Sequence, residues 1–116
     1  MKKNSKEVAS DVSTAIKSFE KDYMGRGPQD IKTFVLEDMI LVRLRGILTP
    51  AEQNLASHED GISLIKQTRM KLLENARDIL TNIVFEIVGE QVLSLHTDID
   101  VEKDERIIIF TLNNKL

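Results

Sequence analysis

His96, Asp98 and Asp100 alternate along a predicted strand near the C-terminus, and their side chains could do chemistry together. Side chains two residues apart in a strand point to the same side, about 6.8 Å apart, so all three project from one face. Two of them with a further carboxylate could ligate a divalent metal, and His96 could act as a general acid or base with Asp98 orienting its ring. The same row could form a cross-strand ion-pair network, with Asp100 opening a hairpin turn. We favour this structural interpretation, because such geometry rarely makes a site by itself.

Arg43 and Arg45 alternate in the same way on another predicted strand, which suits them as ion-pair partners of that acidic row. A second candidate is Gly25-Arg26-Gly27-Pro28, which offers a flexible loop and a guanidinium to a phosphate or a carboxylate. It matches neither the Walker A spacing nor a dinucleotide fingerprint, so a helix stop followed by a bend is the favoured interpretation. We predict no catalytic residue, no metal site and no cofactor. The candidate ligand-binding residues are Arg26, Arg43, His96, Asp98 and Asp100.

The composition excludes several classes of function. The 116 residues include no cysteine, which excludes disulfides, thiol nucleophiles and thiolate metal sites and fits a reducing cytoplasm. A net charge of −3 and 4% aromatic residues argue against a nucleic-acid partner. Apolar runs such as Ile107–Phe110 fall far short of the roughly 20 residues of a membrane-spanning helix, and no apolar signal segment follows the basic start of the chain. We expect a soluble, cytoplasmic protein that is not an enzyme and does not insert into a membrane.

The glycine-rich phrase follows a predicted amphipathic helix from Lys6 to Met24. Apolar residues recur there every three or four positions, which places them on one face. Gly25 is suited to end this helix in the left-handed conformation, and Pro28 prevents its resumption. Residues 1–6 are expected to be a disordered N-terminus. The apolar stripe consists of Val8, Val12, Ile16, Phe19 and Tyr23.

The two arginines lie in a predicted hairpin of strands Ile31–Leu36 and Met39–Arg45, joined by Glu37 and Asp38. Both segments are rich in β-branched and large apolar residues, which favours strands. Apolar side chains alternate in the second strand, so one set should face the core. That set is Ile40, Val42 and Leu44.

Thr49-Pro50-Ala51-Glu52 is the strongest local pattern in the chain, because it combines a capping box with proline at the first helical position. It predicts a helix to about Ser57, followed by a longer helix from near Gly61 to Val88 that Gly89 ends. The second half of that helix is more broadly apolar and should be the better buried half. The residues that widen its stripe are Ile79, Phe85 and Val88.

The acidic row belongs to a second predicted hairpin, with strands Val92–Asp100 and Arg106–Leu112. The segment Ile107–Phe110 is continuously apolar, which indicates a central strand or one covered on both faces. The order helix, hairpin, two helices, hairpin predicts a single α+β domain over residues 1–116. Its four-stranded antiparallel sheet should pack under the long helix.

The second face of this sheet is expected to be too apolar for contact with water. Either the N-terminal helix or a second subunit must cover it, and we favour a homodimer because small domains usually associate with twofold symmetry. The residues expected on this face are Ile31, Val35, Met39, Leu41, Val92, Ile107 and Ile109.

Several short phrases, taken in order, resemble the MpsC family of bacterial proteins from about Val8 to Leu112. They are Gly25-Arg26-Gly27-Pro28, Gly46-Ile47-Leu48-Thr49-Pro50-Ala51-Glu52, Gly89, and Ser94-Leu95-His96-Thr97-Asp98-Ile99-Asp100. That family is associated with a sodium-translocating, membrane-potential-generating system. The resemblance implies a small soluble bacterial protein that works beside membrane bioenergetics or inorganic-carbon uptake. It brings no established catalytic residues to this chain.

A soluble acidic chain cannot itself translocate an ion, so the resemblance implies an accessory protein that docks on membrane-protein partners or regulates their production. The leading hypothesis is therefore a non-enzymatic interaction module that works as a homodimer. The alternative is a regulatory module that responds to a small ligand or a metal through the face of His96, Asp98 and Arg43, or through the loop of residues 25–28. A hydrolase or transferase built on His96 and Asp98 is the least favoured.

Overall fold

The N-terminal helix α1 spans Ser5–Tyr23 in this computed structural model, which describes residues 3–116. Asn4 begins it by accepting a hydrogen bond from the Glu7 backbone N–H at 2.8 Å. Gly25, at φ +87°, follows its last turn in the left-handed conformation, as predicted. Ser5 and Lys6 are helical, so the expectation of a disordered N-terminus is wrong for these two residues, while residues 1–2 lie outside the described part.

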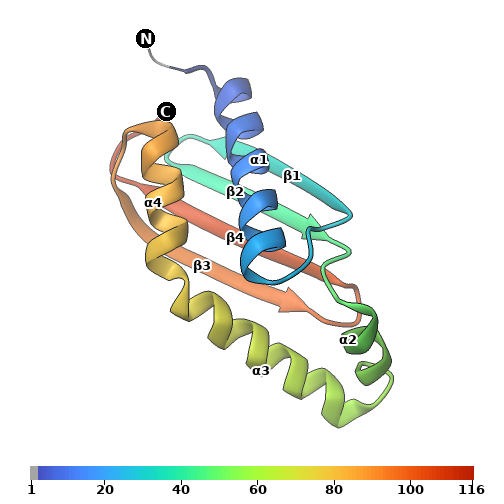
Figure 1. Ribbon diagram of the computed structural model, residues 1–116. Coiled ribbons are helices and arrows are strands. Elements are labelled where there is room, and N and C mark those ends of the chain that lie inside the picture. The colour runs from blue at the N-terminus through green and yellow to red at the C-terminus, as the bar shows by residue number, and fades with distance from the viewer. Residues whose placement is uncertain (1–2) are drawn as a thin grey trace.

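The sheet consists of β1 (Asp30–Leu36), β2 (Met39–Arg45), β3 (Val92–Asp100) and β4 (Glu105–Leu112). All neighbours pair antiparallel in the order β1-β2-β4-β3 (Figure 1). The apolar strand β4 is central, as its continuous hydrophobic run indicated. The α+β architecture with two hairpins and one four-stranded antiparallel sheet is therefore confirmed.

Three helices connect the two hairpins: α2 (Pro50–Leu55), α3 (Glu59–Asn75) and α4 (Arg77–Val88). The predicted capping box of α2 is present, with reciprocal hydrogen bonds between Thr49 and Glu52. The expectation of one continuous helix from Gly61 to Val88 is wrong, because the chain turns at Ala76. Ala76 is fully buried and its N–H is shared between two carbonyls of the preceding turn. This turn lets α4 lie over the sheet while α3 runs on past the β3 edge (Figure 1).

The hydrophobic core lies between one face of the sheet and the helices α1 and α4, which lie side by side on that face (Figure 1). Ile40, Val42 and Leu44 are fully buried there, as predicted from their alternation. Two residues expected to widen the buried stripe of α4 are instead exposed, Ile79 by 48% and Phe85 by 45%. Among residues 3–116, no helix is long and apolar enough to cross a bilayer.

The opposite face of the sheet is not covered by α1, which excludes the N-terminal helix as its cover. Three residues expected on this face lie on the helix-covered side instead, because they pair with core residues across the ladder. The hairpin register decides this, since a residue directly opposite a core residue shares its side. The three corrections are Ile31 opposite Leu44, Val35 opposite Ile40, and Val92 opposite Leu112 before a bulge.

Candidate functional site

The uncovered side of the sheet, called the open face from here on, is an ordered grid of side chains. Because the pairing partners of antiparallel strands share a side, the register assigns four rows that cross β1, β2, β4 and β3 in turn. The first two rows are Leu36, Met39, Thr111 and Ser94, then Phe34, Leu41, Ile109 and His96. The third and fourth rows are Lys32, Arg43, Ile107 and Asp98, then Asp30, Arg45, Glu105 and Asp100.

The first two rows make one half of the open face apolar. Phe34 is 47% exposed, Leu36 46% and Met39 38%, while Leu41 and Ile109 beside them are half-buried. Contiguous exposed side chains of this size mark an interaction surface more often than a solvent-facing one. The structure thus confirms an apolar second face, with Phe34 and Leu36 in the places that Ile31 and Val35 were expected to take.

The other two rows are charged, and the third row separates the signs, with Lys32 and Arg43 on β1 and β2 and Asp98 on β3. In the fourth row, Asp30 stands on β1 and Arg45 on β2. Arg43 and Arg45 both reach Glu105 Oε2, at 2.8 Å from Arg43 Nη2 and 3.2 Å from Arg45 Nε. Asp98 and Asp100 stand on β3 at the other edge. The ion-pair network expected for the two arginines exists, but its carboxylate is Glu105 rather than the acidic row of β3.

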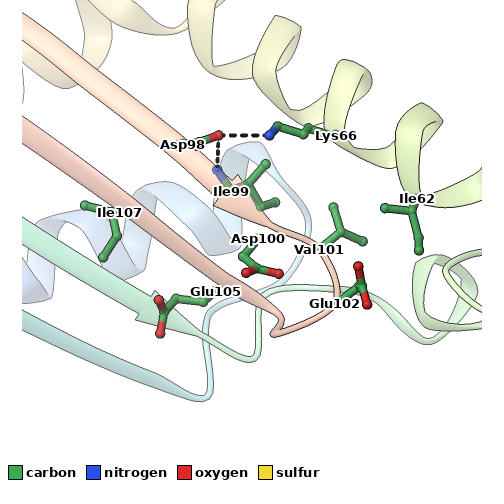
Figure 2. Close-up of a pocket in the computed structure, with 9 residues that line it drawn as sticks. All are labelled: Ile62, Lys66, Asp98, Ile99, Asp100, Val101, Glu102, Glu105 and Ile107. Carbon is green, nitrogen blue, oxygen red and sulfur yellow. Dashed lines mark hydrogen bonds and ion pairs between the residues drawn. The ribbon is translucent and has the colours of Figure 1, made fainter.

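A shallow depression of about 360 Å³ lies at the β3 edge, where α3 passes beside it (Figure 2). Asp98 Oδ1 accepts a hydrogen bond from the Ile99 N–H at 2.8 Å and lies 3.3 Å from Lys66 Nζ. The backbone hydrogen bond, and then Lys66, hold the pKa of Asp98 below its usual value. Asp100 Oδ1 accepts from the Lys103 N–H at 3.0 Å, so it closes the hairpin turn as one interpretation anticipated.

His96 does not form the acid–base pair with Asp98 that their spacing allowed. Its Nε2 lies 3.2 Å from Ser94 Oγ, one row further along the face, while Asp98 contacts Lys66 and Ile99. The two side chains share a face but are engaged by different neighbours. Among residues 3–116, no group of three or more His, Cys, Asp or Glu side chains is placed to hold a metal ion.

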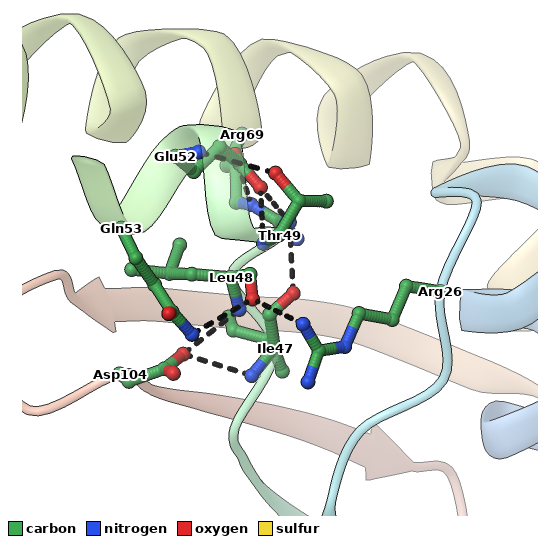
Figure 3. A network of polar contacts seen from close by, with 8 residues as sticks. All are labelled: Arg26, Ile47, Leu48, Thr49, Glu52, Gln53, Arg69 and Asp104. Atoms are coloured by element: carbon green, nitrogen blue, oxygen red, sulfur yellow. Dashed lines mark hydrogen bonds and ion pairs between the residues drawn. The ribbon is translucent and has the colours of Figure 1, made fainter. Parts of the chain in front are cut away.

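Arg26 lies far from this row and binds the connection between β2 and α2 (Figure 3). Its Nη1 donates to the Leu48 carbonyl at 2.9 Å. From the other side, Asp104 Oδ1 accepts from the backbone N–H groups of Ile47 and Leu48 at 2.8 and 2.9 Å. The guanidinium of the glycine-rich loop therefore satisfies a backbone carbonyl, which is a structural role.

Arg69 on α3 is the central residue of this network and is almost fully buried. It binds Glu52 through two hydrogen bonds, Nε to Oε2 at 2.9 Å and Nη2 to Oε1 at 2.6 Å, and donates from Nη2 to the Ile47 carbonyl at 3.0 Å. Burial alone would raise the pKa of Glu52, but the hydrogen bonds from Arg69 and Thr49 outweigh it and lower that pKa. The bidentate pair with Glu52 thus joins α3 to α2, and the hydrogen bond to Ile47 joins α3 to the segment that follows β2.

Two further charged side chains lie inside the core: Glu20 on α1, 2% exposed, and Arg106 on β4, 1% exposed. Burial raises the pKa of Glu20 against the opposing attraction of Arg106 and Arg69. Burial likewise lowers the pKa of Arg106. Nε and Nη2 of Arg106 donate no hydrogen bond to any residue between 3 and 116, so charge attraction rather than directed bonding holds this pair.

Glu20 should make the fold less stable as the pH rises. Its pKa is higher folded than unfolded, so between the two values the folded state holds the proton that the unfolded state has lost, and stability falls with pH. Glu20→Gln removes this titration. We therefore expect the free energy of unfolding of the wild type, minus that of Glu20→Gln, to decrease from pH 4 upwards in urea titrations. A difference that stays constant or increases with pH would contradict a pKa of Glu20 that burial raises.

The sequence interpretation missed most residues that shape these features. Arg69 is not among the predicted site residues, although an arginine in the apolar stripe of a helix is the available signal of a buried arginine with a partner. Asp104 has a left-handed backbone, at φ +52°, and its carboxylate role depends on a loop distant in sequence. Phe34 and Leu36 were missed because the alternating side chains of β1 were assigned to the wrong faces of the sheet.

One family model and two curated proteins match this chain. The family model described as "Na+-translocating membrane potential-generating system (MpsC)" matches residues 4–114. The chain is 45% identical over 116 residues to "Uncharacterized protein YbcI" of Bacillus subtilis (strain 168), covering 100% of this chain and 94% of that protein. It is 26% identical over 102 residues to "Uncharacterized protein YrhF" of the same organism, covering 87% of this chain and 84% of that protein. No solved structure matches the chain.

Proposed function

This chain belongs to the MpsC family, and from that membership we propose that it is a non-enzymatic accessory protein of a membrane-potential-generating system. It works in the cytoplasm as a homodimer and docks on a membrane-protein partner that translocates the ion. The family description supports the link to sodium translocation, and the chain's own surfaces support the role as an interaction module.

The main support is that exposed apolar side chains gather on both sides of the sheet. On the open face they are Phe34, Leu36 and Met39. On the helix side, Ile79 of α4 is 48% exposed and joins Phe19 and Tyr23 of α1 around a shallow depression. Two separate apolar surfaces suit a protein that contacts a second copy with one and a different partner with the other.

The geometry of the polar row also favours an interaction module over an enzyme. His96 contacts Ser94 while Asp98 is held by Lys66, so the pair that general acid–base catalysis needs is not assembled. Arg43 and Arg26 are both engaged by protein oxygens.

The experiment that tests this function captures partners from detergent-solubilised membranes with the tagged full-length chain, and measures membrane potential with a voltage-sensitive dye after deletion of its gene. We expect co-purification of an integral membrane protein and a lower potential. Ile79→Glu should abolish the capture, whereas Lys71→Glu, an exposed control on α3, should retain it. Capture of the chain alone together with an unchanged potential would refute the proposal.

A second candidate, a module that responds to a small ligand, is favoured by the depression at the β3 edge, where Asp98, Asp100 and Lys66 offer polar groups. A ligand at 100 times its dissociation constant stabilises the fold by about 2.7 kcal/mol. Thermal unfolding with divalent metals, bicarbonate, phosphate and nucleotides, each added separately, tests it. An unchanged melting temperature with all of them removes this candidate.

A further inference from the structure

The charge pattern of the open face is complementary to itself, which specifies how the proposed homodimer, on which this inference rests, is built. In the third row, Lys32 stands on the β1 edge of the sheet and Asp98 on the β3 edge. Both side chains are exposed. The first two rows are apolar at their centre, where Met39, Leu41 and Ile109 lie. One half of the face therefore offers hydrophobic area at its centre. The third row offers opposite charges at opposite edges, whereas the fourth row ends in Asp30 and Asp100.

We infer that two copies pack open face to open face, about a twofold axis that lies between the sheets and runs parallel to the strands, between β2 and β4. This rotation keeps each row opposite the same row of the second copy and exchanges the edges. β1 then lies over β3 of the second copy, and β2 lies over its β4. The result is an aligned β-sandwich, a common way for two sheets to pack.

In this arrangement the apolar centres of the first two rows meet each other, and the charged rows meet with opposite sign at positions 32 and 98 and at positions 45 and 105. Leu41 faces Ile109 of the second copy, which buries the centre of the apolar half. Lys32 faces Asp98 of the second copy, and symmetry makes this contact twice. Arg45 faces Glu105 of the second copy in the fourth row. Asp30 faces Asp100 of the second copy, a like-charge contact at the outer corners that opposes the arrangement and that solvent weakens, and Arg43 faces Ile107.

The other twofold axis within the interface, perpendicular to the strands, does not fit. It would place each strand over itself and turn the charged rows onto the apolar ones. Arg45 would then lie over Met39 of the second copy, and Lys32 over Phe34. This axis brings neither Lys32 nor Arg45 to a carboxylate of the second copy, whereas the parallel axis brings both to one, so the charge pattern selects the parallel axis.

The size of the face sets the concentration range of the test. Four strands of about seven residues cover roughly 450 Å² in projection. A standard interface buries about 800 Å² per partner, so this dimer should dissociate on dilution. The mass must therefore be followed over a series of protein concentrations.

The test uses two variants, Lys32→Asp and Asp98→Lys, analysed by light scattering separately and after mixing. Each variant alone places like charges opposite each other twice, and we expect its dimer dissociation constant to rise roughly 10- to 100-fold. In the mixed dimer, both contacts between positions 32 and 98 join opposite charges. Mixing should therefore restore dimers, and native mass spectrometry should find them to be heterodimers. The matched control is Lys71→Asp mixed with Glu86→Lys, two exposed positions on the helix side, where mixing should change nothing.

The results distinguish a homodimer with a different axis from the absence of a homodimer. Met39→Glu weakens any dimer that uses the open face, whatever the direction of its axis. If Met39→Glu dissociates the dimer while mixing the charge variants gives no heterodimer, the axis inferred here is wrong and the homodimer stands. If the wild type is monomeric at every concentration, both the homodimer and its proposed axis are refuted. Circular dichroism of each variant establishes that it is folded, which exposed substitutions should permit.

Discussion

Replacing Arg69 with alanine should lower the free energy of unfolding by about 3–5 kcal/mol, the largest loss we expect from a single polar residue. The substitution removes both hydrogen bonds to Glu52 and the donor to the Ile47 carbonyl, and it leaves space at a position only 3% exposed. Because Arg69 joins three elements, the loss should be a loss of the whole fold rather than local fraying. Urea denaturation at neutral pH measures it.

Two control substitutions distinguish the loss of the Arg69–Glu52 pair from a general effect of substitution in α3. Lys71→Ala, on the exposed side of α3, should change stability by less than about 0.5 kcal/mol. Arg69→Lys keeps the charge but loses the planar fork, so it should recover only part of the stability. A loss below about 1 kcal/mol in Arg69→Ala would mean that the pair with Glu52 contributes little beyond a solvent-exposed ion pair.

The pair also has a defined dependence on pH. The pKa of Glu52 is lower folded than unfolded, so its contribution is present above the unfolded value and is lost as the pH falls through the folded one. The difference in stability between the wild type and Arg69→Ala should therefore shrink in acid, opposite to the trend expected from Glu20.

Gly61→Ala should cost about 2–3 kcal/mol, although helix propensity alone predicts a gain of up to about 1 kcal/mol. Gly61 lies in the first turn of α3, where α2 packs against it. A Cβ built there would lie 2.0 Å from the Leu55 carbonyl oxygen and 2.9 Å from its carbon. These are backbone atoms that cannot rotate away, so α2 would have to move. Because Glu52 belongs to α2, that movement also disturbs its pair with Arg69.

Gly27→Ala is the matched control for this substitution. A Cβ at Gly27 would meet its nearest neighbours at an ordinary distance of 3.9 Å, and its backbone is not left-handed. We expect a change within about 0.5 kcal/mol in the same urea titration. A Gly61→Ala protein that is as stable as the wild type would show that α2 can shift without loss.

The candidate site could be predicted from the sequence only where one strand determines it. The alternation of His96, Asp98 and Asp100 predicts that the three side chains share one face of β3, and they lie there. The ion-pair partners could not be predicted, because Lys66, which contacts Asp98, comes from a helix, and Glu105, which binds Arg43, comes from a strand distant in sequence. The same holds for Arg26, whose acceptor Leu48 lies 22 positions further along the chain. Contacts between distant segments depend on packing and leave no local pattern.

By itself, the sequence determined the features that arise within one turn or one strand. The capping box at Thr49 and Glu52, the helix stop at Gly25 and the buried side of β2 each follow from interactions a few residues apart. Tertiary structure decided the break at Ala76, because no glycine or proline interrupts that helix and packing on the sheet bends it there. It also decided which side of β1 joined the core. The pairing register, a property of two strands together, thereby placed Phe34 and Leu36 on the open face.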